Sequence, residues 1–341
     1  MIKYAAFDVS VNDSALCILD ADGNIVEETK VASEADAVAE ALRQHRAEIG
    51  LVGLEAGPMS QHLFDGLAGA GYPVVCCETR HTKAFLKARR NKTDRNDAKG
   101  IAQMMRTGLY QEVHVKTRAS QEIRALMGAR KTLQSQMLDL QNSIRGVLKN
   151  FGLKVGSVSA DGFAAKVRQL ILSEPALQQA IEPLLAGLAE LRKQFKEQDR
   201  QVRRLAKKDE ICRLFMTAQG VGELTALSFK AGVDQPQRFA KSKSVGAHFG
   251  LTPWRYESGE IAYDGRISKR GDGSVREHLY EAANATLNNT KKWSWLKAWA
   301  MEIAKRRGME KAKIALARRL AEVLHRMWCD GTTFQWQRAA A

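Results

Sequence analysis

Cysteine is scarce in this sequence, and the shortage excludes two classes of protein. The 341 residues include only five cysteines: Cys17, Cys76, Cys77, Cys212 and Cys329. This number is odd and too small for the disulfide framework of a small secreted domain. No CxxC pair is present to indicate a structural zinc site. We therefore expect reduced thiols and a cytoplasmic protein.

Long apolar runs are also missing. No segment approaches the roughly 18 consecutive apolar residues of a membrane-spanning helix, so we expect no membrane partner. Near the N-terminus, Asp8 and Asp13 interrupt any apolar stretch, which argues against a signal peptide. Internal repeats are absent as well. A chain of 341 residues with ordinary apolar content predicts two or three globular domains.

Acidic residues are concentrated at one end of the chain. Residues 1–78 hold 4 Lys and Arg against 13 Asp and Glu, whereas residues 79–341 hold 49 against 25, a net charge of +24. A basic body of this size favours a polyanionic partner, because neutralising phosphates releases their counterions. The alternative is a protein that is merely soluble and basic.

The pattern of apolar residues predicts an α/β fold for the N-terminal domain, residues 1–115. Strands are predicted over 2–9, 15–19, 25–31, 51–54 and 72–77. Helices are predicted after residue 33, over about 60–70, and around 94–97. Three strands followed by helix, strand, helix, strand and helix is the element order of an RNase H-like (RuvC-like) fold, a mixed sheet with helices on its faces.

Four acidic residues occupy positions typical of a metal site in that fold. Asp8 lies inside the first strand, where an unpaired charge is costly, and Glu55 ends the fourth strand. Asp94 and Asp97 are three residues apart, so they share one face of a helix. An RNase H-like fold brings these elements together at one edge, where two Mg²⁺ ions would serve phosphodiester chemistry. Each acid alone is as well explained as a surface residue or helix cap, but together they favour the metal site.

A run of basic residues precedes the last two acids. It consists of Lys83, Lys87, Arg89, Arg90 and Lys92. Such a run is usually a solvated face, but beside a metal site it is suited to holding a nucleic-acid backbone.

Heptad spacing predicts a helical arm over residues 116–210. Apolar residues recur at steps of three and four between Ile123 and Phe151 and again between Leu184 and Leu205. Arg130 and Gln198 are the polar exceptions. Two such helices predict an antiparallel coiled coil that serves oligomerisation or grips nucleic acid, and an ordinary helical bundle is the alternative.

The remaining residues, 211–341, predict a mainly α-helical C-terminal domain. Residues 254–276 are rich in Gly, Arg, Lys and Ser, and helical patterns continue to about residue 329.

Six short motifs occur in order along the chain and resemble one family. They are FDVS at 7–10, GLEAGP at 53–58, KTDRNDA at 92–98, FGLTP at 249–253, YESG at 256–259 and ISKRGDGSVR at 267–276. Together they resemble the DEDD insertion-sequence transposases, relatives of the Piv invertase and of the RNA-bridge-guided recombinases. Two positions depart from the family pattern: Val11 stands where a lysine is usual, and EAGP replaces EATG. Neither removes a carboxylate, but the missing lysine leaves an auxiliary phosphate contact in doubt.

The resemblance implies a RuvC-like domain whose acid tetrad is Asp8, Glu55, Asp94 and Asp97, with Mg²⁺ as cofactor. It also implies a coiled-coil arm and a transposase domain whose nucleophilic serine corresponds to Ser258. The implied partners are double-stranded donor and target DNA, a structured noncoding RNA that pairs with both, and further copies of the chain, as a dimer assembling into a synaptic tetramer. Such a protein is prokaryotic and associated with the nucleoid.

The residues around Ser258 leave alternatives open. A serine needs a base or metal for activation, and no histidine is adjacent, because His248 and His278 are ten and twenty residues away. The charge on a phosphate under attack is expected to be neutralised by five basic residues: Arg255, Arg266, Lys269, Arg270 and Arg276. Rival nucleophiles are Ser242, Ser244, Ser268 and Ser274, and Ser258 is equally suited to completing a Ser-Gly turn.

The leading hypothesis is RNA-guided DNA recombination through a transient bond to Ser258. A RuvC-like junction endonuclease that uses water is the alternative enzyme, and a basic nucleic-acid-binding scaffold is the non-enzymatic alternative.

Overall fold

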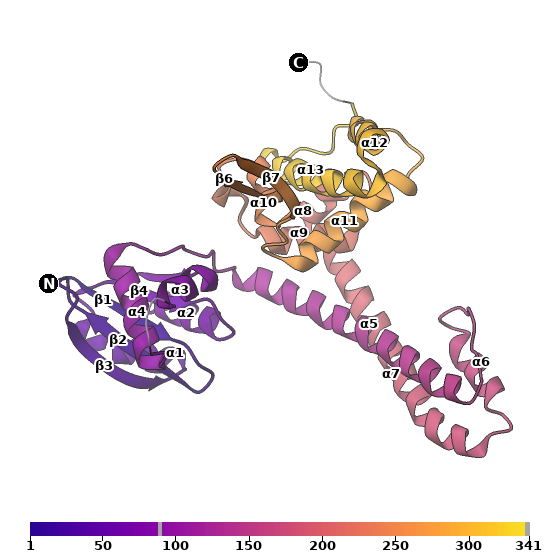
Figure 1. The fold of residues 1–341 in the computed structure, drawn as a ribbon, viewed down its shortest axis with the longest axis horizontal. Coiled ribbons are helices and arrows are strands. Elements are labelled where there is room, and N and C mark those ends of the chain that lie inside the picture. The colour runs from indigo at the N-terminus through magenta and orange to yellow at the C-terminus, as the bar shows by residue number, and fades with distance from the viewer. Residues whose placement is uncertain (88–90, 338–341) are drawn as a thin grey trace. The chain divides into compact units, whose positions relative to one another are not determined.

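The computed structural model describes residues 1–87 and 91–337. Contacts within the chain separate two compact units, Met1–Lys116 and Thr117–Ala341 (Figure 1). Each unit has hydrophobic cores of its own. The units also differ in charge, because the first carries 14 Lys and Arg against 16 Asp and Glu, whereas the second carries 39 against 22. The predicted three-domain division stays a prediction.

The first unit is built on a five-stranded mixed sheet. Its strands are β1 (Lys3–Asp8), β2 (Asp13–Leu19), β3 (Ile25–Ala32), β4 (Ile49–Glu55) and β5 (Val74–Cys77). In space they follow the order β3-β2-β1-β4-β5, with β1, β2 and β3 antiparallel to one another and β4 and β5 parallel to β1. All five predicted strands are present, and the prediction of an α/β N-terminal domain is confirmed.

Helices cover both faces of this sheet. Alternate residues of a strand point to opposite faces, so central strands buried on both sides are apolar throughout. One face packs against α1 (Ala35–Ala41) and α2 (Ser60–Gly69), and the other packs against α4 (Asp94–Thr107). In β1, Phe7 joins the first of these cores and Ala6 joins the second. Helix α3 (Thr79–Leu86) follows β5.

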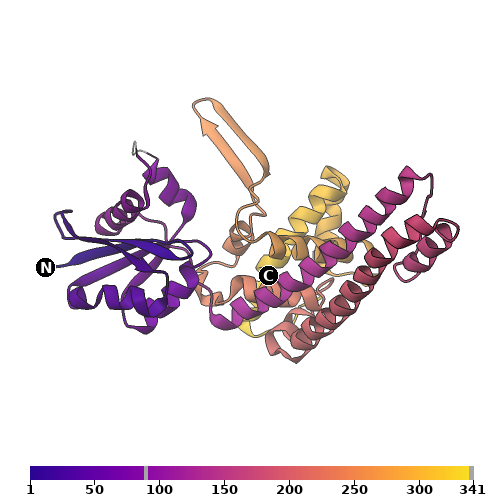
Figure 2. The same ribbon diagram turned by 90° about the horizontal axis from the view of Figure 1, so that it is seen from below.

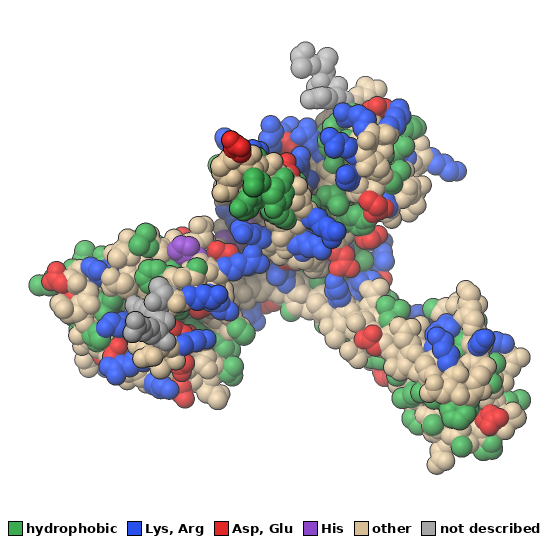
Figure 3. All heavy atoms as spheres, viewed as in Figure 1, with side chains coloured by type: hydrophobic (Ala, Val, Ile, Leu, Met, Phe, Trp, Pro, Cys, Tyr) green, Lys and Arg blue, Asp and Glu red, His purple; other side chains and the backbone are tan. Residues whose placement is uncertain are grey.

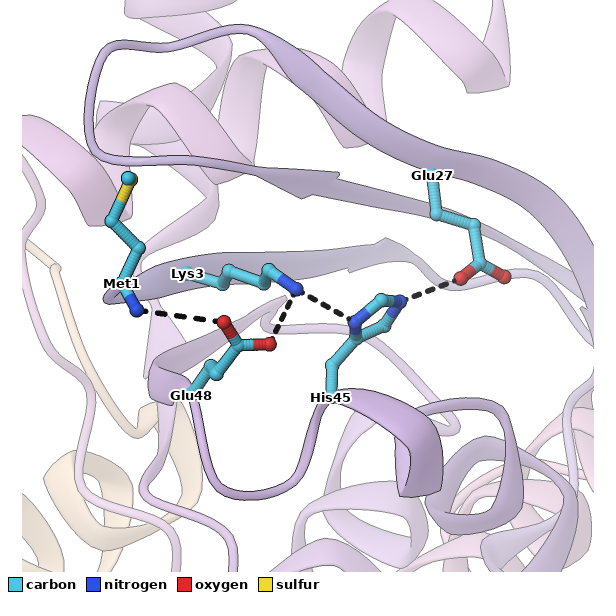
Figure 4. Close-up of polar contacts among 5 residues, drawn as sticks. All are labelled: Met1, Lys3, Glu27, His45 and Glu48. Carbon is cyan, nitrogen blue, oxygen red and sulfur yellow. Dashed lines mark hydrogen bonds and ion pairs between the residues drawn. The ribbon is translucent and has the colours of Figure 1, made fainter.

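A polar network fixes the start of β1 and the turn before β4. The Lys3 ammonium contacts the Glu48 carboxylate and lies 3.0 Å from Nδ1 of His45, in a 3₁₀ turn (Arg43–His45) (Figure 4). Nε2 of His45 lies 2.9 Å from the carboxylate of Glu27 on β3. The network therefore ties three separate segments together around Lys3, whose side chain is only 14% exposed.

Two long antiparallel helices dominate the first part of the second unit. They are α5 (Arg118–Asn150) and α7 (Pro175–Lys208), with the short α6 (Phe163–Leu170) between them (Figure 1). Apolar residues of the predicted seam, such as Ile144 and Leu188, are buried in one core. The predicted pair of helices is therefore present, and each covers the seam of the other.

The two polar exceptions in the seam have different environments. Arg130 lies between the helices, where its guanidinium is 2.7 Å from the Asp199 carboxylate and covers the ring of Phe195. Burial raises the pKa of Asp199, but hydrogen bonds from Arg203 and Arg130 outweigh it and hold that pKa below its usual value. In contrast, the buried Oε1 of Gln198 finds no hydrogen-bond partner among the described residues.

The rest of the second unit is mainly helical, as predicted. Its helices are α8 (Glu210–Phe215), α9 (Glu223–Val233), α10 (Lys243–His248), α11 (Gly273–Asn288), α12 (Trp295–Arg307) and α13 (Met309–Asp330), with a 3₁₀ turn at Pro236–Arg238. They enclose one core that includes Phe215, Phe229 and Phe249.

One β-hairpin interrupts these helices, and the sequence pattern did not predict it. Strands β6 (Pro253–Ser258) and β7 (Ile261–Ile267) pair antiparallel within the segment that composition alone marks as rich in Gly, Arg, Lys and Ser. The hairpin projects away from the helices of its own unit (Figure 2). Across residues 1–87 and 91–337, no helix is both long enough and apolar enough to cross a membrane.

Candidate active site

The strand register brings the first two acids together. Phe7 of β1 pairs with Leu54 of β4, so Asp8 and Glu55 follow side by side at the carboxyl ends of two parallel strands. Asp8 is two residues beyond Ala6, and Glu55 is two beyond Gly53, which contacts α4. Because side chains alternate along a strand, both carboxylates point to the face that α4 covers.

Helix α4 supplies the other two acids from its first turn. The Thr93 hydroxyl caps this helix by accepting a hydrogen bond of 3.2 Å from the Asn96 amide. Asp94 and Asp97 follow the cap, where the positive end of the helix dipole favours negative charge. Ile101 and Met105, further along, anchor the helix to the sheet.

The four carboxylates interact with one another electrostatically. Partial burial, then Asp97, Asp94 and Glu55, raise the pKa of Asp8 from 3.8 to about 6, against the opposing effect of Lys92. Burial also raises the pKa of Glu55, opposed by Lys83 and increased by Asp97. Within the described residues, none of the four side chains makes an ion pair or a hydrogen bond. The acids therefore form a cluster of negative charge that the described chain leaves uncompensated at close range.

The donor chemistry of this cluster fits a hard divalent cation. Carboxylate oxygens are the ligands that Mg²⁺ prefers, and no sulfur or imidazole is involved. As placed, no three His, Cys, Asp or Glu side chains among the described residues are grouped closely enough to share one metal ion. The cluster thus has the charge and ligand type of a magnesium site, while its carboxylates stand further apart than bound ligands would.

Lysines line the same pocket as the acids. Glu55 and Asp97 share it with Lys83, Lys87 and Lys92. Three of the predicted phosphate-contacting residues therefore lie beside the carboxylates. Arg89 and Arg90, which were predicted with them, lie outside the described residues. Leu86 and Asn91 also line the pocket, and no pattern in the sequence singled them out.

The predicted nucleophile lies at the end of the hairpin in the second unit. Ser258 pairs with Ile261, and Gly259 begins the two-residue connection with a φ of 56°. A positive φ at this position is what a type II′ hairpin turn requires, and glycine adopts it without strain. The Ser258 side chain is exposed and makes no hydrogen bond with a described residue. Neither His248 nor His278 is its partner, since they contact Arg238 and the Ser274 carbonyl.

Three of the rival serines have partners elsewhere. The hydroxyl of Ser242 lies 2.9 Å from Nδ1 of the buried His325, whose Nε2 faces the Pro236 carbonyl. Ser244 donates to the Lys241 carbonyl, and the Ser268 hydroxyl is 3.5 Å from the Arg270 amide.

The five basic residues expected around Ser258 divide into two groups. Arg276 donates to the carbonyl oxygens of Phe249 and Arg270, so it holds the root of the hairpin together. Lys269 and Arg270 lie exposed at that root. Arg255 pairs with Glu257, and strand alternation places Arg255 on the hairpin face opposite Ser258. Arg266 lies exposed at the register shift between the Arg255–Asp264 and Pro253–Ile267 pairs.

We predict that Asp8→Asn stabilises the metal-free protein at pH 8 and changes little at pH 4.5. A raised pKa means that the folded state binds the proton more tightly, so stability is lost as pH rises from about 4 to about 6. The shift corresponds to at most about 3 kcal/mol, and partial exposure of the carboxyl to water reduces the expected gain to roughly 1 kcal/mol. Urea denaturation in chelator at both pH values measures it.

Asp65→Asn, an exposed acid on α2, is the matched control and should change the free energy of unfolding by less than about 0.5 kcal/mol. An equal effect of Asp8→Asn at both pH values would show that the charge of the partly buried Asp8 carboxylate is not the cause.

Comparison with known proteins covers most of the chain. Residues 5–152 match a family model for DEDD transposases of the IS110 type, described as a transposase, and residues 212–299 match the transposase IS116/IS110/IS902 family. A transposase for insertion sequence element IS1111A from Coxiella burnetii is 30% identical over 331 residues, which span 95% of this chain and 88% of that protein.

Two further relatives have similar names. A putative transposase from Sinorhizobium fredii is 26% identical and covers 84% of this chain and 74% of its own length. A transposase for insertion sequence element IS1328 from Yersinia enterocolitica is 24% identical, with 83% and 85% covered. The chain therefore belongs to the IS110-type family of DEDD insertion-sequence transposases.

Proposed function

We propose that this transposase cuts and rejoins DNA strands with a Mg²⁺-dependent acid tetrad and a serine nucleophile, guided by a structured RNA. The observation that carries the proposal is the electrostatic interaction of Asp8 with Glu55, Asp94 and Asp97 at one sheet edge, where none of the four makes an ion pair with a described residue. A cluster of unpaired carboxylates is costly in a fold, and a cation-dependent site is the usual reason to retain one.

An RNase H-like assignment of the first unit is part of this proposal. The sheet order β3-β2-β1-β4-β5, with three antiparallel strands followed by two parallel ones, supports it. So does the supply of the acids from β1, the end of β4 and the start of α4.

The four acids would hold Mg²⁺ by their carboxylate oxygens. When bound, Mg²⁺ supplies positive charge that stabilises the oxygens of a phosphodiester under attack. The chain itself contributes Lys83, Lys87 and Lys92, which line the pocket and neutralise neighbouring phosphates. Asp8 must be ionised to take part, and neutral or alkaline pH satisfies this requirement.

In the proposed strand cleavage, the Ser258 hydroxyl oxygen attacks a phosphorus atom of the DNA backbone. A serine–phosphate bond forms, the bond from phosphorus to one deoxyribose oxygen breaks, and that oxygen leaves as a hydroxyl after gaining a proton. The proton of Ser258 passes to a base, which we expect to be a carboxylate. Attack by a second deoxyribose hydroxyl reverses these changes and joins new strands without an external energy source.

The second unit would provide the grip on nucleic acid. Its net charge of +17 supports binding of DNA and of a structured noncoding RNA. Within it, we propose that residues 116–210 form a coiled-coil arm and 211–341 a transposase domain. Phe151 and Leu172 near the tip of the helix pair are 60% and 77% exposed, which supports a role of the arm in assembling dimers and a synaptic tetramer.

The metal proposal predicts that Asp97→Asn abolishes both strand transfer and the stabilisation that Mg²⁺ provides. Removing one ligand should lower strand transfer at least a hundredfold, an order-of-magnitude expectation. Thermal unfolding with and without Mg²⁺ gives a readout that is independent of activity. Asp65→Asn should respond to Mg²⁺ as the native chain does. Full strand transfer in chelator would end the metal-site proposal.

The RNA proposal predicts tight binding of a structured RNA that weakens steeply with salt. Raising salt from about 50 mM to about 200 mM should lower the affinity on the order of a thousandfold, if six or more phosphates are contacted. Titrations at several salt concentrations measure this slope. Removal of RNA should also stop strand transfer, and adding back the RNA of the element should restore it. Undiminished strand transfer without RNA would leave a mechanism guided by protein alone.

The serine proposal predicts a covalent protein–DNA adduct that maps to Ser258. Ser258→Ala should remove the adduct and all joined product but keep nucleic-acid binding, because the side chain is exposed and its loss costs less than about 0.5 kcal/mol. Denaturing gels of trapped reactions, followed by peptide mapping, measure it. Ser258→Cys should keep only a trace of adduct, since a thiolate attacks with altered geometry.

Ser244→Ala, which removes the hydroxyl that donates to the Lys241 carbonyl, is the control and should form the normal adduct. An adduct on Ser242 would support the covalent mechanism but show that Ser258 is not the nucleophile. Free cut ends without any adduct would favour the endonuclease that uses water.

A further inference from the structure

Three aromatic side chains form a continuous row along one face of the β6–β7 hairpin. The ring centroid of Tyr263 lies 5.6 Å from that of Trp254 and 5.5 Å from that of Tyr256. Trp254 is 44% exposed, Tyr256 is 46% exposed and Tyr263 is 51% exposed. Figure 3 shows hydrophobic side chains gathered over this part of the second unit. Large aromatic groups left half-exposed on a projecting ribbon indicate a surface that a partner covers.

The register places Ser258 on the same face as the row. Tyr256 pairs with Tyr263, and Ser258 pairs with Ile261 two residues further along. Side chains two residues apart in a strand share a face, so Ser258 adjoins Tyr256. The charged residues Arg255, Glu257 and Asp264 alternate with these positions and therefore occupy the opposite face. The hairpin thus has one aromatic face that ends at the serine and one charged face.

The row is held in place before any partner arrives. A Cβ at Gly265 would collide with the indole of Trp254, so the glycine allows that ring to lie flat on β7. Glycine is needed there for space, since its backbone φ is ordinary. The flat indole in turn packs against the edge of Tyr263.

The root of the hairpin is also closely packed. A Cβ at Gly250 would collide with the backbone of Lys269 and Arg270, and the Lys269 amide donates to the Gly250 carbonyl. Arg276 donates to two carbonyl oxygens of the same crossing. These contacts anchor the hairpin to the helices of its own unit, so little conformational entropy is lost in the hairpin when a partner binds.

Charge favours a nucleic acid as the partner. The unit that carries the hairpin has a net charge of +17, so it attracts a polyanion more strongly than a second copy of the same charge. A DNA strand is attracted instead, and the flat faces of its bases stack on tyrosine and tryptophan rings. Bases are available for stacking only where they are unpaired, as they are next to a strand break or in an opened duplex.

We propose that Trp254, Tyr256 and Tyr263 form a stacking platform for unpaired bases of the DNA strand whose phosphate is attacked by Ser258. This inference rests on the proposed function for the identity of that strand. Stacking at Tyr256 holds the base next to the reacting phosphate and keeps the backbone extended over the serine. The platform selects for unpaired bases and against intact duplex, without reading their sequence.

The test uses the full chain and a DNA duplex with a short single-stranded gap. A second duplex carries abasic sites in place of the unpaired bases. The native protein should bind the first roughly tenfold more tightly than the second, because each stacked base contributes a measurable share of affinity. Tyr256→Leu and Tyr263→Leu, which keep an apolar cross-strand pair but remove the ring, should lose most of this preference. Tyr256→Phe should retain it.

Trp293→Leu is the matched control, since Trp293 is 60% exposed in the same unit but outside the hairpin, and it should bind as the native chain does. The slope of affinity against salt should be equal in all variants, because stacking releases no counterions. A 2-aminopurine in the gap should be quenched on binding by the native chain and remain bright with the leucine variants.

Outcomes that overturn the platform are distinct from failure of the serine proposal. Leucine variants that bind and form adduct normally would refute the platform and leave Ser258 as nucleophile. Equal affinity of the native protein for the gapped and abasic duplexes, or a preference for single-stranded RNA over the gapped DNA, would also refute it. Loss of self-association in the leucine variants, with unchanged DNA binding, would assign this face to a second copy. A preference for the gapped over the abasic duplex, in a protein that forms no adduct at Ser258, would support the platform and refute only the role of Ser258 as nucleophile.

Discussion

The close approach of α4 to Gly53 is the contact on which the acid site depends. A Cβ at this position of β4 would lie 2.7 Å from the Met105 sulfur and 3.1 Å from Cγ2 of Ile101. Without a side chain at residue 53, the helix lies directly on the sheet, and its first turn reaches the edge where β1 and β4 end. Asp94 and Asp97 then interact with Asp8, which belongs to a strand separated from them by most of the unit. A larger residue in β4 would lift the helix and part the acids.

The apolar cores and the acid edge have opposite effects on the stability of the first unit. Two apolar cores on the faces of the sheet stabilise the first unit, one of them through Phe7 and Leu54 and the other through Ile101 and Met104. The acid edge destabilises the folded unit at neutral pH, since burial and mutual repulsion raise the pKa of Asp8 to about 6. Stability that the cores provide is thus partly spent on holding four like charges together, as is common where a site must bind a cation.

The sequence predicted the elements that depend on neighbouring residues and missed those that depend on contacts between distant residues. The five strands follow from runs such as IKYAAFDV and from turn residues, which act within a few positions. The helix pair follows from heptad spacing, and even the exception at Arg130 has a partner, Asp199, that lies across the seam. The hairpin was missed because its stability comes from the cross-strand pair Tyr256–Tyr263 and from Trp254 lying over Gly265. No local pattern records such contacts, and the surrounding glycines and basic residues resemble a loop. The pocket shared by Lys83 and Glu55 likewise required the fold.

The charge difference between the two units bears on how a substrate reaches the acid edge. The first unit carries 14 basic against 16 acidic residues, and its four clustered carboxylates repel a phosphate at close range. Lys92 beside Asp8, and Lys83 and Lys92 beside Glu55, offset part of this negative charge, since they lower the pKa values that burial raises. The second unit has a net charge of +17, so it attracts a nucleic-acid backbone at distances up to about one Debye length. On the proposed function, the second unit would supply most of the electrostatic attraction for DNA. The four acids of the first unit would then accept a phosphate only once a cation offsets their charge.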